Sequence, residues 1–246
     1  MPTADFYHCP AMRREAYTRQ LLHDLIEWDV ASWKQALAIW DAAVPDPRGL
    51  RVLEVGSRNG GVSLYWALKG CEVVCSDRGG PTEAARRLHA RYGVADRVAY
   101  EAVDATKMPF DAGGFDVVCF KSVLGGIGAA MGPEGQRQAL REMHRVLRPG
   151  GRLLFAENTT ASPLHALLRR RLVAWGTRWR YVPPSELPEL LEGFENVRLE
   201  YAGFLATFGR REWQRTALHG LDRVLVPIVP ESWRYIVFGR ANKPIA

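Results

Sequence analysis

A single decapeptide combines the end of a strand, a glycine turn and the start of a helix: Val52-Leu53-Glu54-Val55-Gly56-Ser57-Arg58-Asn59-Gly60-Gly61. Residues 51–55 form a short apolar run that predicts a buried parallel strand, and residues 61–69 have helical spacing with good helix formers. Glycine lets the backbone between them turn tightly and approach a ligand where a Cβ would collide. The following helix presents unpaired N–H groups and a positive dipole end. The stretch therefore favours an anionic or carboxylate-bearing, nucleotide-like cofactor.

Two acidic residues accompany this turn. Glu54 lies on the strand two positions before Gly56, and Asp77 ends the next apolar run, so the ligand is expected to carry several donor groups. The pattern Glu54-x-Gly56-x-x-x-Gly60 resembles the first motif of the class I S-adenosylmethionine-dependent methyltransferases, acidic-x-Gly-x-Gly-x-Gly. The resemblance implies S-adenosyl-L-methionine as the cofactor and places Ser57 among the residues that bind it.

Arg58 stands where that family usually has its middle glycine. The outer glycines are retained, so the departure concerns the cofactor's pose more than its identity. Two interpretations stay open: Arg58 pairs with the cofactor's carboxylate, or it points into solvent. Glycine turns also occur in dinucleotide-binding folds. A nicotinamide-dependent oxidoreductase is therefore an alternative, disfavoured by Glu54 and by the missing Gly-x-Gly-x-x-Gly.

The composition is that of an ordinary globular protein. With 246 residues, 47% hydrophobic and 24% charged, the chain is long enough for one large α/β domain. The formal net charge of +6 permits an anionic partner. No apolar run of 18 residues and no signal-peptide pattern occurs, so we expect a cytoplasmic protein without a transmembrane segment. The four cysteines lack metal-site spacing and are expected to be buried thiols.

Successive strand ends carry the expected ribose and adenine contacts. A strand at 72–76 and a helix at about 81–92 bracket Asp77 and Arg78. The resemblance implies that Asp77 accepts hydrogen bonds from both ribose hydroxyls, and Arg78 beside it is assigned to the cofactor site. A strand at 97–102 precedes Asp104 and Ala105, which match the family positions that meet the adenine.

A fourth strand, 115–120, finishes at Lys121-Ser122. In the family, this position directs groups towards the methyl transfer, so Lys121 and Ser122 are assigned to the cofactor site and Lys121 also to catalysis. An exposed, protonated lysine is the ordinary expectation for Lys121. The segment Gly125-Gly126-Ile127-Gly128 is expected to be a mobile loop that lines the pocket.

The N-terminal residues 1–45 resemble the helical lid of many small-molecule methyltransferases. Helices are expected at 11–28 and 31–43. Its helical spacing with Trp40 favours a packing role for Trp33, which is nevertheless our candidate among the tryptophans for a wall of the methionine pocket. His8 and Tyr17 are candidates to reach the reacting centre, and for His8 a solvated arm is the alternative.

Residues 134–147 predict an amphipathic helix before a strand at 152–156, and the segment 141–151 closely resembles one typical of the family. His144 within it is expected to be structural. Glu157-Asn158 ends the fifth strand. One carboxylate and one amide make a poor divalent-cation site, so no metal is expected.

Residues 159–246 are expected to bind substrate and to close the sheet with two antiparallel strands, near 195–203 and at 233–240. The basic and aromatic segment 169–181 allows an anionic small molecule, a lipid headgroup or RNA, and a solvated helix with buried tryptophans fits it as well. The predicted fold is α/β, a doubly wound, seven-stranded, mostly parallel sheet with a C-terminal antiparallel hairpin, in a single domain with its cofactor core at 50–158. The predicted function is methyl transfer to an O, N or C nucleophile of a small molecule. Nucleic acid is not the expected partner, and an RNA methyltransferase or a non-catalytic cofactor-binding protein are the alternatives.

Overall fold

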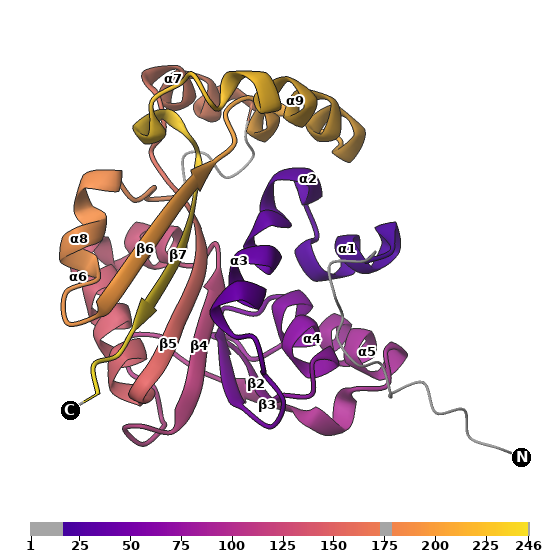
Figure 1. Ribbon diagram of the computed structural model, residues 1–246, viewed down its shortest axis with the longest axis vertical. Helices are drawn as coiled ribbons and strands as arrows, with labels where there is room; N and C mark the ends of the chain where they lie inside the picture. Colours follow the sequence, from indigo (N-terminus) through magenta and orange to yellow (C-terminus); the bar gives the residue numbers. More distant parts are fainter. Residues whose placement is uncertain (1–16, 173–178, 246) are drawn as a thin grey trace, which may run out of the picture.

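The computed structural model describes residues 17–172 and 179–245. A seven-stranded sheet runs through the centre of the molecule (Figure 1), in the order β3-β2-β1-β4-β5-β7-β6. Its first five strands are mutually parallel, and β7 is antiparallel to both β5 and β6. This arrangement confirms the predicted fold class. The strands are β1 (Arg51–Val55), β2 (Glu72–Asp77), β3 (Val98–Ala102), β4 (Phe115–Lys121), β5 (Leu147–Asn158), β6 (Glu195–Ala202) and β7 (Ile236–Asn242).

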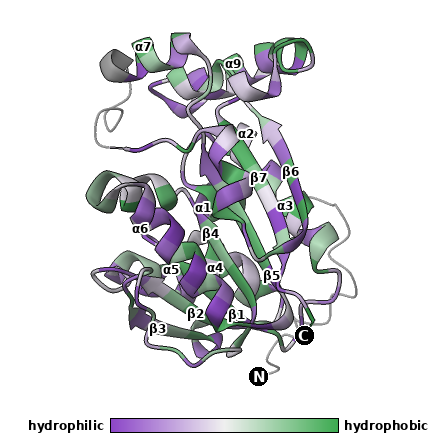
Figure 2. Ribbon diagram, turned by 90° about the vertical axis from the view of Figure 1, so that its left-hand side faces the viewer, coloured by the Kyte–Doolittle hydropathy of each residue, from purple (hydrophilic) through white to green (hydrophobic). Residues whose placement is uncertain are grey.

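The two faces of the sheet pack against different helices. Alternate residues of a strand point to opposite faces, so Val52 and Cys119 belong to one core cluster while Leu53 and Phe120 belong to the other. The first face is covered by α3 (Gln35–Ala43), α4 (Gly61–Leu68) and α5 (Glu83–Arg91), and the second by α6 (Leu124–Val146) and α8 (Leu187–Leu190). The apolar strands lie between these layers (Figure 2). Cys71, Cys75 and Cys119 are buried thiols, as expected.

The prediction of a mobile loop at residues 125–128 is wrong. These residues form the first turns of α6, which begins at Leu124 and kinks at Gly132, directly before Pro133. Three glycines in five residues do not favour a helix. The carboxylate of Glu157 compensates by accepting the backbone N–H groups of Val123 (2.7 Å) and Leu124 (2.6 Å), which caps the start of the helix.

The N-terminal helices are shorter than predicted. The helix α1 spans Arg19–Ile26, and the predicted helix 31–43 is divided into α2 (Val30–Trp33) and α3. Residues 11–16 of the first predicted helix lie outside the described part of the chain. The C-terminal part of the chain adds the helices α7 (Pro163–Leu172) and α9 (Glu212–Leu225).

A buried polar cluster ties α2 to the C-terminal part of the chain. Glu212 of α9 accepts the backbone N–H groups of Asp29 (2.9 Å) and Val30 (2.7 Å). The hydroxyl of Tyr235, which precedes β7, donates to Asp29 and also lies 3.0 Å from Ser32 Oγ. Burial raises the pKa of Asp29 to about 7. The N-terminal helices are thereby held against the end of the sheet, where α7 and α9 lie together (Figure 1).

No helix in residues 17–172 or 179–245 is long and apolar enough to cross a membrane.

The substitution Tyr235→Phe is expected to lower the free energy of unfolding by about 1–3 kcal/mol, because the buried Asp29 carboxyl loses its hydroxyl donor. Urea denaturation followed by circular dichroism measures the change. Tyr201→Phe is the matched control, since the half-buried Tyr201 hydroxyl makes no hydrogen bond to a described residue. Equal stability of the two variants would show that the Asp29 cluster does not hold the helices in place.

Candidate cofactor and acceptor site

A cavity of about 510 Å³ opens at the carboxyl edge of the parallel strands. It lies where the strand order reverses between β1 and β4, the usual ligand position in open α/β sheets. Its walls come from the β1 turn, the ends of β2 to β4, the end of α1, the first half of α6 and one residue after α7. The lining includes Leu25, Glu27, Trp28, Glu54, Gly56, Ser57, Arg58, Asp77, Arg78, Asp104, Ala105, Lys121, Ser122, Ile127, Met131 and Trp179.

The turn after β1 uses a left-handed backbone at three positions. Gly56 has φ +69°, Arg58 φ +50° and Gly60 φ +78°. A Cβ at Gly56 would lie 2.6 Å from the Val123 side chain, and one at Gly60 would lie 2.8 Å from the His89 ring. Glycine is therefore required at both of these positions. Arg58 is also left-handed, a conformation that residues with a side chain seldom adopt. Gly60 itself precedes α4 and lies outside the cavity wall.

Arg58 contributes to the site mainly through its backbone. Its N–H donates to Asp77 Oδ2 at 2.9 Å, which links the β1 turn to the end of β2. The Arg58 side chain is 70% exposed and lies 3.6 Å from Glu27 at the end of α1. Glu27 also accepts a hydrogen bond from Asn59 at 3.1 Å. The described contacts of the Arg58 guanidinium are thus with an acid of the N-terminal helices and with solvent.

Glu54 is a buried carboxyl group in the wall of the cavity, only 2% exposed. The backbone N–H of Ser63 donates to its Oε2 at 2.8 Å, and the Ser63 hydroxyl donates to the same oxygen. Burial raises the pKa of Glu54 to about 8, while the Ser63 hydrogen bonds and Lys121 oppose the shift. A positive charge in the cavity would favour the ionised form.

Asp77 and Asp104 lie at the ends of neighbouring strands and share one feature. Each has one carboxylate oxygen held by the chain, by Arg58 N–H for Asp77 and by the N–H and hydroxyl of Thr106 for Asp104. The other oxygen of each accepts no hydrogen bond from a described residue. The Thr106 hydrogen bonds lower the pKa of Asp104, so this acid is held ionised. Both carboxylates remain able to accept hydrogen bonds from a ligand.

Lys121 is half-buried in the cavity wall, in contrast to the exposed lysine expected from the sequence. Its ammonium lies 5.3 Å from the Trp28 ring and 5.2 Å from the Trp33 ring, within range of cation–π attraction. Burial lowers the pKa of Lys121, opposed chiefly by the nearby Glu27. Among the described residues, no carboxylate oxygen lies within 4.0 Å of the Lys121 nitrogen.

The N-terminal candidates have different outcomes. Trp33 is fully buried and does not line the cavity, whereas Trp28, whose ring lies 5.0 Å from that of Trp33, does. Tyr17 packs against the core and does not line the cavity either; burial, with a smaller contribution from Asp41, raises its pKa well above the usual value. His8 lies outside the described residues. The sequence could not show that Trp28, and not Trp33, lines the cavity, because both are tryptophans in the same predicted helical region.

The polar residues at the end of β5, Glu157 and Asn158, form hydrogen bonds within the chain. Glu157 Oε1 accepts the Asn158 N–H at 2.8 Å while Oε2 caps α6, so both carboxylate oxygens are used internally. Asn158 donates to the Ser122 hydroxyl at 2.8 Å. Burial raises the pKa of Glu157 to about 7. Within the described residues, no group of three or more His, Cys, Asp or Glu side chains is arranged to hold a metal ion.

The described residues of the basic segment 169–181 point inward. Arg169 is 3% exposed, donates to the carbonyl oxygens of Thr159 and Thr160, and lies 3.8 Å from the Tyr181 ring. Arg180 forms an ion pair with Glu186 at 2.7 Å. Trp179 is half-buried and lines the cavity. His144, in the helical segment below the sheet, hydrogen-bonds to the Gly193 carbonyl at 3.1 Å and packs on Phe194, which agrees with a structural role.

Comparison with known proteins identifies the central part of the chain. Residues 53–155 match the family model described as a methyltransferase domain. The chain is 36% identical over 129 residues to a demethylmenaquinone methyltransferase of Clavibacter sepedonicus, covering 52% of this chain and 48% of that protein. It is 34% identical over 114 residues to a malonyl-[acyl-carrier protein] O-methyltransferase of Enterobacter lignolyticus, covering 46% of this chain and 41% of that protein. The chain thus spans about half or less of the length of these relatives.

Comparison with solved structures shows that the chain also has the fold of a methyltransferase. Phosphoethanolamine N-methyltransferase 2 of Haemonchus contortus, solved with S-adenosyl-L-methionine, superimposes with a TM-score of 0.62 over 94% of this chain and 58% of that one, at 19% identity. The matched domain at residues 53–155, the seven-stranded sheet and the glycine turn together support a class I S-adenosylmethionine-dependent methyltransferase.

Proposed function

We propose that this protein transfers the methyl group of S-adenosylmethionine to an O, N or C nucleophile of a small molecule. The observation that carries the proposal is the set of acids at three successive strand ends, Glu54, Asp77 and Asp104, on the wall of one cavity. The relatives named as a demethylmenaquinone methyltransferase and as a malonyl-[acyl-carrier protein] O-methyltransferase support an acceptor of the small-molecule type.

The described residues fit the cofactor. The cavity volume lies in the range of cofactor sites. The left-handed backbone at Gly56 permits close approach of a ligand, and the acids match a ligand with two positive charges. We assign Asp77 to the ribose hydroxyls, Asp104 and Ala105 to the adenine, and Glu54 with the β1 turn to the methionine end. Arg78 and Ser122 line the same cavity and complete the assigned contacts.

S-adenosylmethionine supplies a methyl group on a sulfonium, a good leaving group, so the protein's task is mainly alignment and exclusion of water. We propose that Lys121 faces the acceptor. As an ammonium it stabilises a negative acceptor oxygen, and as an amine it accepts the acceptor's proton. Its lowered pKa makes the second role accessible nearer neutral pH. Tyr17 and His8 remain secondary candidates for a catalytic role. Tyr17 does not line the cavity, and His8 lies outside the described residues.

RNA as the acceptor is less well supported. Arg169 and Arg180 of the segment proposed for RNA are engaged within the chain, and nucleic-acid grooves instead present free basic side chains. An anionic small molecule that meets Lys121 remains compatible with the site.

The substitution Asp77→Ala is expected to weaken S-adenosylhomocysteine binding more than tenfold, corresponding to about 1.4 kcal/mol for one lost charged hydrogen-bonding group. Isothermal titration calorimetry measures the dissociation constant. Asp96→Ala, an exposed acid outside the cavity, is the matched control and should bind normally. If Asp77→Ala binds as tightly as the control, the ribose assignment is wrong.

The affinity for S-adenosylmethionine is expected to rise with pH between about 6 and 7.5. Glu54 has a pKa raised to about 8 in the free protein, so it is mostly protonated in this range. A cationic ligand favours its carboxylate form, and binding therefore releases a proton and tightens as pH rises, by at most tenfold per pH unit. Glu27 and Lys121 face the same carboxyl and contribute opposite charges.

Calorimetry in two buffers of different ionisation enthalpy detects the released proton directly. In Glu54→Gln the release and most of the pH dependence should disappear. Proton release that persists in Glu54→Gln would assign the linkage to another group.

A further inference from the structure

Trp179 forms part of the cavity wall and is not among the residues that we assign to the cofactor. This indole lies directly against the first turn of α6. A Cβ on Gly125 would overlap its pyrrole ring, and one on Gly126 would come within 3.2 Å of its six-membered ring. The glycines at the start of α6 therefore create the flat surface on which Trp179 rests. This gives a structural reason for glycine at these two helical positions.

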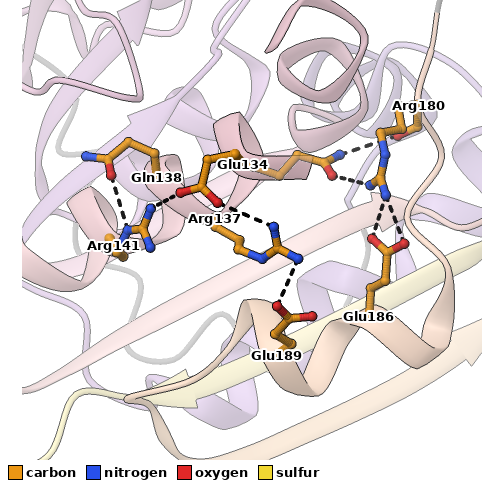
Figure 3. A network of polar contacts seen from close by, with 8 residues as sticks. Glu134, Arg137, Gln138, Arg141, Arg180, Glu186 and Glu189 are labelled. Atoms are coloured by element: carbon orange, nitrogen blue, oxygen red, sulfur yellow. Dashed lines mark hydrogen bonds and ion pairs between the residues drawn. The ribbon is translucent and has the colours of Figure 1, made fainter. Parts of the chain in front are cut away.

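The next residue, Arg180, fixes the segment that carries Trp179. Its backbone N–H donates to the Gly125 carbonyl at 3.0 Å. Its guanidinium donates to both carboxylate oxygens of Glu186, at 2.8 and 2.7 Å, and to the Gln136 side chain (Figure 3). Gln136 is fully buried and donates in turn to the Leu124 carbonyl at 2.7 Å. One guanidinium nitrogen is thus held by the Glu186 carboxylate and another by Gln136, and charge-assisted hydrogen bonds to two partners restrict the geometry of the side chain.

The position of Trp179 separates it from the assigned cofactor residues. Glu54, Asp77 and Asp104 come from the ends of β1 to β3, on one side of the point where the strand order reverses. Trp179 lies on the other side, beyond β4, against the helix that begins three residues after Lys121. Ile127 and Met131 of the same helix add apolar surface to this part of the wall.

We propose that Trp179 is the specificity-determining residue of the acceptor site, where its indole selects a flat, aromatic acceptor, and that Arg180 is its positioning residue. This inference rests on the proposed methyl transfer and names the class of acceptor. An indole held rigidly in a cavity wall attracts a planar ring more strongly than a puckered ring of the same carbon skeleton. Lys121, which lines the same cavity, suits a hydroxyl substituent on that ring.

The test uses two probes with one carbon skeleton, 2-naphthol and decahydro-2-naphthol, titrated into the full chain saturated with S-adenosylhomocysteine. Wild type is expected to bind the flat probe about tenfold more tightly. In Trp179→Leu this ratio should fall at least threefold, while in Trp179→Phe most of it should remain. Since each ratio compares the same two probes, differences in their acidity cancel between variants. The S-adenosylhomocysteine dissociation constant should stay within twofold throughout.

Two matched controls isolate the role of Trp179 and its support. Trp213→Leu removes a tryptophan that is 65% exposed on α9 and should leave the ratio unchanged. Arg180→Gln should lower the ratio, whereas Arg137→Gln, which breaks the neighbouring ion pairs to Glu134 and Glu189, should not. Gly125→Ala should act like Trp179→Leu, because the added methyl displaces the indole.

An unchanged ratio in Trp179→Leu would overturn the inference, as would a wild type that binds S-adenosylhomocysteine but neither probe. Weakened S-adenosylhomocysteine binding in Trp179→Leu would also overturn it, by assigning Trp179 to the cofactor. A wild type that does not bind S-adenosylhomocysteine would refute the proposed function itself.

Discussion

The left-handed turn that follows β1 is the constraint on which the site depends. Its backbone brings the Arg58 N–H to Asp77, and it ends at Gly60, whose carbonyl contacts the buried His89 ring at 2.9 Å. The turn therefore fixes the spacing between the ends of β1 and β2 and the start of α4. Gly56 lines the cavity with backbone atoms alone, and a Cβ there would collide with Val123.

The opposite side of the cavity depends on buried polar groups instead. Glu157 at the end of β5 starts α6 by accepting two backbone N–H groups, which allows glycines to occupy the first turn of a stable helix. Those glycines then receive Trp179, whose neighbour Arg180 is bound by Glu186 and Gln136. One side of the cavity is thus formed by main-chain geometry and the other by packed side chains.

The sheet and the grouping of Glu54, Asp77 and Asp104 around one cavity could be predicted from the sequence because their signals are local. Apolar strand runs, the glycine turn and the acids at strand ends each occupy a few consecutive residues. The cavity wall at Trp179 could not be predicted, since it depends on contacts between distant segments. Nothing near Gly125 shows that Glu157 caps its helix or that Trp179 fills the space above it. Likewise, the pattern that placed Trp33 in a helix could not distinguish the cavity wall from the core behind it, where Trp33 lies.

The most direct test of the account is the thermal stability of the wild-type chain with S-adenosylhomocysteine, compared with reduced nicotinamide cofactors. A ligand at a hundred times its dissociation constant stabilises the folded state by about 2.7 kcal/mol, a clear shift in melting temperature. The account predicts a shift with S-adenosylhomocysteine and none with the nicotinamides. A shift with the nicotinamides alone would contradict the assignment of Glu54 and of the cavity it lines.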